Sequence, residues 1–329
     1  MHGNSPQKGA YLNNGNGWTW APQYIPPFHI AADDIGDTGA RFIDLNRDGR
    51  VDLAYHRWRM HGNSPQKGAY LNNGNGWTWA PQYIPPFHIA ADDIGDTGAR
   101  FVDLNGDGRV DLAYHRWRMH GSSPQKGAYL NNGNGWTWAS RYVPPFHIAA
   151  DDIGDAGSRF VDLNGDGRVD LAYHRWRMNG NSPQKGAYLN NGNGWTWAPQ
   201  YIPPFHIAAD DIGDTGARFV DLNGDGRIDL AYNRWRMNGN PPQKGAFLNN
   251  GKDWSWAPQY IPPVSIAADD IGDAGSRFVD LNGDGKMDLV YYRWMKSQEE
   301  QKGAYLVLGF MGDHTKPHFD AADFDMDKC

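Results

Sequence analysis

Apolar residues in this chain come in short runs of the kind that β-strands bury, and no stretch repeats them with the spacing of a useful amphipathic helix. "RFIDL", from Arg41, is short, apolar and partly β-branched, so it is predicted to be a strand. "VDLAYHRW" is a second predicted strand. Its alternating positions give two faces, Leu53, Tyr55 and Arg57 on one and Ala54, His56 and Trp58 on the other.

The following residues predict a hairpin. "MHGNSPQ" has the Gly, Asn, Ser and Pro content of a loop, and "KGAYLNN" and "GWTWAPQY" then read as a third and a fourth strand. The "NNGNG" between those two strands is a strong hairpin signal, because Asn and Gly tolerate positive φ. A Pro-Pro pair, Pro26 and Pro27 in the first copy, then ends the ladder, since proline has no N–H to donate.

The whole pattern repeats with a constant 59-residue period. The stretch "DLNRDGRVDL" at Asp44 returns with small changes at Asp103, Asp162, Asp221 and Asp280. Four short strands in each period predict an all-β fold, a β-propeller of tandem four-stranded blades, because a β-helix solenoid uses far shorter repeats. We expect one propeller domain over residues 1–329. Its predicted parts are an N-terminal half-blade (1–40), four full repeats (41–99, 100–158, 159–217 and 218–276) and a divergent C-terminal repeat (277–329).

The number of blades is left open by the sequence. The acidic stretch occurs five times, but "KGAYL" or "KGAFL" occurs six times, from Lys8 to Lys302. Five blades result if the half-blade joins the final strands and leaves the last "KGAYL" over; otherwise six blades form, one of them incomplete. The chain starts in mid-repeat, so the true start of the protein is open. The near-identity of the copies is consistent with recent duplication or with deliberate construction.

The acidic stretch has the spacing of a calcium loop. In its first copy Asp44, Asn46, Asp48 and Asp52 stand at positions 1, 3, 5 and 9, and the carbonyl of Arg50 stands at position 7. An EF-hand would need a glutamate at position 12, which is a tyrosine here, and flanking helices instead of strands. We therefore predict a Ca²⁺ loop inside a β-hairpin. A metal-free turn is the alternative, but its three clustered aspartates would repel one another. The same ligands are predicted in the other copies: Asp103, Asn105, Asp107, Arg109 and Asp111; Asp162, Asn164, Asp166, Arg168 and Asp170; Asp221, Asn223, Asp225, Arg227 and Asp229; Asp280, Asn282, Asp284, Lys286 and Asp288.

Composition narrows the partners. The net charge of −7 argues against nucleic acid, and 15 of the 38 acidic residues are the loop aspartates. The one cysteine, Cys329, cannot form an internal disulfide. No apolar run reaches membrane-spanning length, and the N-terminus lacks the features of a signal peptide. Calcium loops of low affinity suit extracellular modules, so we expect an extracellular location.

The stretch "RFVDLNGDGRVDLAY" resembles the FG-GAP or VCBS repeat of integrin α-subunit propellers, of integrin-like mushroom lectins and of bacterial Tc and Rhs toxin propellers. The match covers five segments of about fifteen residues, and the blade-length repeats extend it over most of the chain. The resemblance implies a propeller fold with calcium at the positions named above. The family usually has seven blades, and this chain is too short for seven.

No Ser/His/Asp set, phosphate-binding loop or Cys/His zinc cluster is present, and features repeated in every blade suit binding better than a single catalytic centre. We expect a non-enzymatic, multivalent lectin that binds glycans or glycoproteins; some calcium propellers of the wider fold are polysaccharide lyases. The alternative is a protein-interaction or scaffold propeller, natural or engineered, with structural calcium alone. Oligomers are possible, and neither nucleic-acid binding nor membrane insertion is expected. The "WTW" tryptophans either pack between blades or line a ligand groove. The predicted ligand contacts are Trp18, Trp20, Tyr24, His56, Trp58, Trp77, Trp79, Tyr83, His115 and Trp117.

Overall fold

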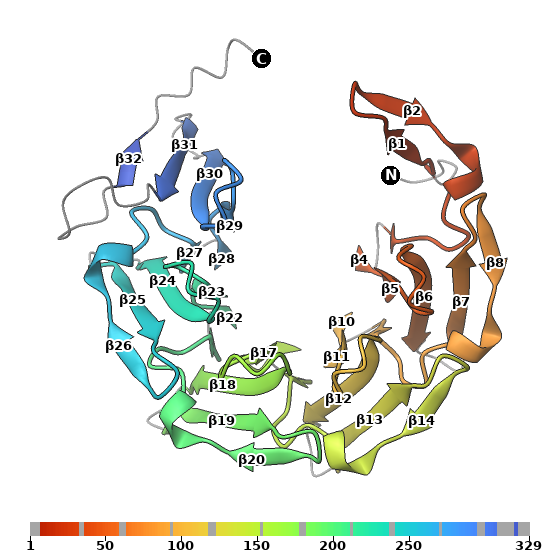
Figure 1. Cartoon of the computed structure of the whole chain (residues 1–329), viewed down its shortest axis with the longest axis horizontal. Helices are drawn as coiled ribbons and strands as arrows, with labels where there is room; N and C mark the ends of the chain where they lie inside the picture. Colours follow the sequence, from red (N-terminus) through yellow and green to blue (C-terminus); the bar gives the residue numbers. More distant parts are fainter. Residues whose placement is uncertain are drawn as a thin grey trace. The chain divides into compact units, whose positions relative to one another are not determined.

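The computed structural model of the chain is all-β, as the sequence predicted. It describes residues 7–32, 36–58, 64–92, 95–117, 123–151, 154–177, 182–210, 213–236, 241–269, 272–294, 300–307 and 319–321. Across these residues there are strands and five single-turn 3₁₀ helices but no α-helix. The fold class is a β-propeller with five blades built from the 59-residue repeats (Figure 1). Among these described residues no helix has the length and apolar character needed to cross a bilayer.

The first four blades are each built from the same six strands in the same order, and the fifth has four strands among the described residues. The first contains β5 (Ala40–Ile43), β6 (Asp52–Trp58), β7 (Gln66–Asn72), β8 (Trp77–Trp79), β9 (Ala90–Ala91) and β10 (Gly95–Asp96). Its sheet has the order β10-β9-β6-β7-β8, and β5 also pairs with β6. Figure 1 labels β5, β6, β7, β8 and β10 of this blade. The other sheets are β11 (Ala99–Val102), β12 (Asp111–Trp117), β13 (Gln125–Asn131), β14 (Trp136–Trp138), β15 (Ala149–Ala150) and β16 (Gly154–Asp155); β17 (Ser158–Val161), β18 (Asp170–Trp176), β19 (Gln184–Asn190), β20 (Trp195–Trp197), β21 (Ala208–Ala209) and β22 (Gly213–Asp214); β23 (Ala217–Val220), β24 (Asp229–Trp235), β25 (Gln243–Asn249), β26 (Trp254–Trp256), β27 (Ala267–Ala268) and β28 (Gly272–Asp273); and β29 (Ser276–Val279), β30 (Asp288–Trp294), β31 (Glu300–Val307) and β32 (Phe319–Ala321).

The four strands predicted for each repeat are confirmed, with two additions. The fourth strand is shorter than predicted, because the segment after "WTW" turns into a 3₁₀ helix: η1 (Pro22–Tyr24), η2 (Pro81–Tyr83), η3 (Ser140–Tyr142), η4 (Pro199–Tyr201) or η5 (Pro258–Tyr260). The predicted link "FHIAADDIGD" contains the small antiparallel pair β9–β10. β9 runs parallel to β6, with Arg57 opposite Ala90.

The ends of the chain settle how the copies of "KGAYL" are used. The last copy forms β31, which pairs with β30 inside the fifth sheet, so it is not left over. The first copy forms β1 (Tyr11–Asn13), which pairs with β2 (Trp18–Trp20). β3 (Ala31–Ala32) and β4 (Gly36–Asp37) form a further two-stranded sheet. The five blades are thus accompanied by an N-terminal half-blade.

The chain forms two compact units, Met1–Asp155 with Asn190–Trp195, and Ala156–Leu189 with Thr196–Cys329. In the first unit one core lies between consecutive sheets. Leu45, Ala54 and Ala69 are completely buried, and Phe101 and Val110 of the following repeat pack against them. The small alanines let the next blade approach closely, and each buried large apolar side chain contributes roughly 1.5–3 kcal/mol.

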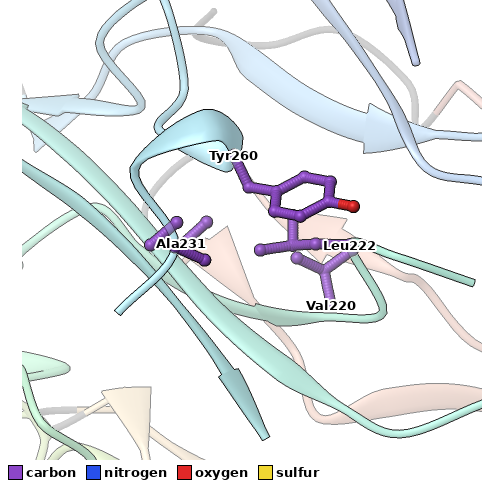
Figure 2. Close-up of a cluster of buried hydrophobic side chains, with 6 residues drawn as sticks. Val220, Leu222, Ala231 and Tyr260 are labelled. Atoms are coloured by element: carbon purple, nitrogen blue, oxygen red, sulfur yellow. The ribbon is translucent and has the colours of Figure 1, made fainter. Parts of the chain in front are cut away.

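The second unit contains the same core. Figure 2 shows Tyr260, from η5, over Val220 and Leu222 with Ala231 beside them, and all four side chains are buried. The 3₁₀ helix after the outer strand therefore carries the aromatic ring that covers the acidic-loop end of its own blade. Tyr24, Tyr83, Tyr142 and Tyr201 stand at the same place in the other four 3₁₀ helices.

The other face of the second blade carries an aromatic ladder. In the second blade, Phe87 stacks on Tyr114 with 3.7 Å between centroids, Tyr114 is followed by Tyr129 at 6.5 Å, and Tyr129 meets Trp138 edge-on at 5.1 Å. Gly127 lies beneath the ladder, where a Cβ atom would come within 2.5 Å of the Tyr114 hydroxyl and 2.6 Å of the Trp138 ring. Burial raises the pKa of Tyr114 to about 12. The glycine of "KGAYL" is thus required by packing.

Candidate functional site

The predicted calcium ligands lie in the loops between the first two strands of each blade, and we call these segments the acidic loops. In the first one, Asp44 accepts hydrogen bonds from the backbone N–H of Arg47 (2.7 Å, Oδ1) and of Gly49 (2.9 Å, Oδ2). Asp48 Oδ1 accepts from the N–H of Arg50 at 2.9 Å. Gly49 has φ of 80°, the positive value that position 6 requires. These bonds fold the loop so that positions 1, 3, 5 and 7 follow one tight turn.

The ninth position of each acidic loop is a buried carboxylate. Asp52 has no exposed surface, and its two oxygens accept from the N–H of Leu45 (2.9 Å) and of Asn72 (2.8 Å). At its counterpart Asp111, burial raises the pKa to about 7, although two backbone N–H donors lower it; Asp103 and Asp107 raise it further by like charge. A buried carboxylate whose pKa is raised by the charge of two others gains from a bound cation.

The donor set therefore fits calcium, although the side chains are not gathered into a finished cage. In the residues described, no three His, Cys, Asp or Glu side chains lie close enough together to hold a metal ion. The loop carboxylates are hydrogen-bonded to the loop's own N–H groups instead. Hard oxygen donors at calcium-loop spacing, with one buried carboxylate of raised pKa, are the chemistry that Ca²⁺ selects. The ligand assignment from the sequence stays a prediction.

The first three acidic loops are each tied to the repeat that follows. Asn131 Nδ2 donates to the carbonyl oxygen of Leu45, 86 residues earlier, at 2.7 Å. Asn190 bonds in the same way to Leu104, at 2.7 Å. In the second unit Asn249 bonds to Leu163, at 2.6 Å. The leucine at position 2 of the loop therefore makes two hydrogen bonds. Its backbone N–H donates to the buried aspartate of its own loop, and its carbonyl oxygen accepts from the asparagine of the next repeat.

Two tyrosines predicted as ligand contacts hold the same junctions together. The Tyr83 hydroxyl donates to the carbonyl oxygen of Gly133 at 2.5 Å, and its ring is buried. The Tyr24 hydroxyl donates to the carbonyl oxygen of Gly74. Both hydroxyl groups are engaged within the protein, so the structure gives these residues a packing role and argues against a ligand contact.

The two predicted histidines are likewise occupied. His56 is 8% and His115 is 7% exposed. The Nδ1 atoms lie 2.7 Å and 2.8 Å from the carbonyl oxygens of Pro85 and Pro144, which can only accept, so Nδ1 carries the proton. Burial lowers the pKa of both rings. A neutral, covered imidazole suits a structural role better than contact with a ligand.

The predicted tryptophans differ in how much of the side chain is exposed. Trp79 on β8 and Trp58 at the end of β6 are each 47% exposed, and Trp117 is 49% exposed. Trp77 is half-buried, and its indole nitrogen has no hydrogen-bond partner among the described residues. Trp18 is the most open, at 72%. We call the exposed residues of the fourth strands the outer tryptophans: Trp20, Trp79, Trp138, Trp197 and Trp256, which are 47–52% exposed.

Sequence reasoning missed the neighbours of both exposed sets. Beside Trp58 lies the ring of His88, with 5.8 Å between centroids, and the preceding Arg57 is buried with its Nε 2.5 Å from Asp92. Tyr70 lies edge-on to Trp79, at 5.0 Å. Tyr70 and Trp79 are direct cross-strand partners, so the hairpin register could have revealed that pair. His88 and Asp92 lie far along the chain from their partners, and no local signal marks them.

Comparisons with known proteins bear on the acidic loops and on the fold. A family model described as EF hand matches residues 218–231, which include the fourth acidic loop. The elements on either side are the strands β23 and β24, so the match concerns the loop and not a helix–loop–helix unit. No curated protein matches the chain.

Several solved structures are similar to the chain, and three of them are described here. The first, a Photorhabdus luminescens Tc holotoxin pore, is 18% identical with a TM-score of 0.45, and the match covers 90% of this chain and 12% of that one. The second, the V. cholerae biofilm matrix protein Bap1, is 13% identical with a TM-score of 0.34, covering 86% and 40%. The third, described as a glycoside hydrolase, is 11% identical with a TM-score of 0.34, covering 89% and 95%. The chain thus spans about an eighth of the length of the first of these chains and about two fifths of the second.

Proposed function

We propose that this protein is a multivalent, non-enzymatic carbohydrate-binding propeller whose acidic loops hold structural calcium. One observation carries the proposal: a half-exposed tryptophan recurs at the same place of the outer strand in the N-terminal half-blade and in each of the first four blades. A single exposed aromatic ring is ordinary on a protein surface, but here the same ring stands at the same place of five outer strands. Their repetition suits a ligand that itself repeats, such as a glycan chain or a glycosylated surface.

The geometry of an outer tryptophan supports stacking on a sugar. Trp138 lies over Gly127 and against the edge of Tyr129, so one part of the ring is fixed by the protein and the rest faces solvent. A ring held in this way loses little further freedom when a ligand binds. An indole offers a flat apolar surface, which suits the C–H face of a pyranose, and an N–H donor at its rim for a hydroxyl.

The strand-end tryptophans Trp58 and Trp117 offer a second repeated surface. Each of them lies next to a histidine ring of the following link, His88 or His147. Among the contacts predicted from the sequence, the proposal therefore rests on the exposed tryptophans. The covered side chains of His56, His115 and Tyr83 support it from within the blade, and the hydroxyl group of Tyr24 is bonded to the carbonyl of Gly74.

Calcium has a structural part in this proposal. When bound, it supplies positive charge to the three carboxylates of each acidic loop. The residues that would hold it in the first loop are Asp44, Asn46, Asp48 and Asp52 with the carbonyl of Arg50, and their counterparts would do so elsewhere. An extracellular setting, where calcium is abundant, belongs to the same proposal.

Multivalency would supply most of the affinity. Equivalent shallow sites on one chain raise avidity far above the affinity of any single site, provided that the ligand can reach several at once. A single-site variant would then weaken binding modestly, and a variant of several outer tryptophans would abolish it.

The test is a glycan-array profile of the protein with calcium and after chelation, followed by titration of each glycan that binds. The triple variant Trp79→Ala, Trp138→Ala and Trp197→Ala should lose binding, and Thr78→Ala on the same exposed strand should keep it. If a folded, calcium-loaded protein binds no glycan, or if the triple variant binds as the parent does, the lectin proposal fails. The protein-interaction propeller would then be the better account.

A further inference from the structure

Position 4 separates the first acidic loop from the other four. It is Arg47 in the first loop and a glycine in the others, Gly106, Gly165, Gly224 and Gly283. The backbone has a positive φ at all five places, 64° at the arginine and 75–77° at the glycines. In the described part of the chain Arg47 is the one residue other than glycine with a positive φ, a conformation that side chains seldom adopt. The first loop alone therefore carries a side chain where the other loops are bare.

The side chain of Arg47 leaves its own loop and lies on the second one, which belongs to the same compact unit. Its Nη1 donates to the carbonyl oxygen of Asp107, 60 residues along the chain, at 2.7 Å. Its guanidinium also covers Gly108, where a Cβ atom would come within 2.8 Å of Cζ and Nη2 of Arg47. At the corresponding glycines of the third, fourth and fifth loops, nothing lies within 4 Å of such a Cβ atom. The second loop thus has a cation from the preceding blade beside its positions 5 and 6.

The second and third acidic loops allow a direct comparison, because their sequences are the same. Both read "DLNGDGRVDL", from Asp103 and from Asp162. In both, the first aspartate accepts from the backbone N–H of positions 4 and 6, at 2.7–2.8 Å. Identical ligands in the same turn should bind a cation equally unless groups outside the loop differ. Arg47 is such a group.

The arginines at position 7 differ between the two loops as well. Arg168 Nη1 lies 3.4 Å from Asp166 Oδ2 in the third loop. Among the residues described, Arg109 makes no such ion pair in the second loop, and its Nε is buried without a hydrogen-bond partner. An exposed pair such as that of Arg168 contributes little, so a bound cation displaces it at small cost. Arg47 is instead held by the carbonyl of position 5, which is not among the predicted calcium ligands, so it stays in place when the loop is filled.

We propose that Arg47 acts as an internal cation that lowers the calcium affinity of the second acidic loop below that of the third. Its guanidinium reduces the repulsion among the three aspartates of the empty loop, so a metal ion gains less on binding and is itself repelled. Because Arg47 is exposed and its charge is partly screened, the Kd values of the two loops should differ roughly twofold to tenfold at low ionic strength. The inference rests on the proposed calcium binding of the acidic loops and is independent of glycan binding.

The test is hydrogen exchange measured by mass spectrometry on the whole protein, titrated with calcium. The peptides 99–112 and 158–171 contain the second and the third loop, and they differ in mass because one begins with Ala99 and the other with Ser158. A bound ion slows the exchange of the N–H groups of its loop, so each peptide reports the calcium concentration that half-fills its own site. In the parent the second loop should need the higher concentration.

Two substitutions of Arg47 separate its charge from its shape. Arg47→Gln removes the charge and should bring the two half-saturation concentrations together, whereas Arg47→Lys keeps the charge and should leave them apart. Lys67→Gln, on the exposed side of β7, removes one charge elsewhere in the same unit and should leave the difference as it is in the parent. High salt should reduce the difference in the parent, because salt screens exposed charges.

Equal half-saturation of the two loops in the parent would overturn the proposal, and so would a difference that persists in Arg47→Gln. The comparison within the parent needs no substitution, so the test holds even if a variant does not fold. If calcium protects neither loop, the proposed calcium binding fails together with this inference. If calcium protects both loops at the same concentration, this inference fails alone.

Discussion

Asn233 makes with its side-chain amide the hydrogen bond that His174 makes with its ring one repeat earlier. The amide Nδ2 lies 2.7 Å from the carbonyl oxygen of Pro262, and the imidazole Nδ1 lies 2.8 Å from that of Pro203. Both side chains are buried, at 4% and 8% exposure. The residue at this place in the repeat therefore needs one hydrogen-bond donor for a buried carbonyl oxygen. It does not need the proton-accepting nitrogen of an imidazole.

The buried histidines should make the protein sensitive to acid. Burial lowers the pKa of His56, His115 and His174 below the value of about 6.5 expected in the unfolded chain. The unfolded state then binds more protons, so the stability that these residues give is present above about pH 6.5 and is lost as the pH falls below it. Each pKa unit corresponds to about 1.4 kcal/mol.

The triple variant His56→Asn, His115→Asn and His174→Asn tests this sensitivity. Its melting temperature should fall less than that of the parent between pH 7 and pH 5, because the amide keeps the bond and takes up no proton. The fourth blade, which already contains Asn233, is the internal precedent for tolerance. Equal pH dependence of both proteins would contradict the prediction.

Calcium should stabilise the fold, and more so at higher pH. Without metal, burial raises the pKa of Asp111 to about 7 and of Asp229 to about 6, well above about 3.9 in the unfolded chain, so stability falls as the pH rises from about 4 to 7. A bound cation removes that penalty. At a hundredfold excess over its dissociation constant, calcium adds roughly 2.7 kcal/mol per site.

Thermal melts with calcium and with chelator, at pH 5 and pH 8, measure this effect. The difference between the two melting temperatures should be larger at pH 8. Magnesium at the same concentration is the control and should shift the melt less, because it needs a tighter octahedron of ligands. Melts that chelator leaves unchanged would refute structural calcium.

The bond between Asn131 and Leu45 should matter for stability. Asn131→Ala leaves the buried Leu45 carbonyl without its donor and should cost roughly 1–3 kcal/mol in the free energy of unfolding. Asn72→Ala is a matched control. Its Oδ1 accepts from Gly74 as that of Asn131 does from Gly133, but its Nδ2 has no leucine acceptor in the described residues. Urea unfolding at low protein concentration should show the smaller loss for Asn72→Ala.

Gly127→Ala should move the outer tryptophan of its blade. The new methyl group would meet the Tyr114 hydroxyl and the Trp138 ring at less than 3 Å, so the ring must lift away from the sheet. Overpacking of this kind costs about 1–3 kcal/mol. We expect a red-shifted tryptophan emission and weaker glycan binding. Binding and emission that match those of the parent would show that the platform does not depend on this glycine.

Much of the fold could be predicted from the sequence because the signals are local. The alternation in "VDLAYHRW", the turn residues of "NNGNG" and the 59-residue period give the strands and the propeller. The spacing of the acidic loop predicts a sharp turn at the glycine of position 6, and Gly49 has the positive φ of such a turn. The pair β9–β10 was missed because Ala-Ala and Gly-Asp carry no apolar alternation, and because β9 pairs with β6, which precedes it in the chain by a whole hairpin.

The candidate contacts were harder to predict, because burial depends on distant partners. His56 is covered by a carbonyl 29 residues away, and the hydroxyl of Tyr83 bonds to a carbonyl 50 residues away. Nothing near these residues in the sequence distinguishes them from the exposed Trp79. A repeat of nearly identical copies adds to the difficulty, since variation between positions is the usual guide to function and is scarce here.

The hydrogen bond that spans 86 residues, from Asn131 to Leu45, links units longer than a single repeat. The second and third full repeats each contain half of two such links, the carbonyl of one and the amide of the other. A cut at any point in the period separates an amide from its carbonyl, while duplication of a whole period creates one new complete link. Unequal crossing-over that adds whole periods to the gene would therefore be favoured. Each added repeat stabilises the protein mainly through the junction that it forms with its neighbour.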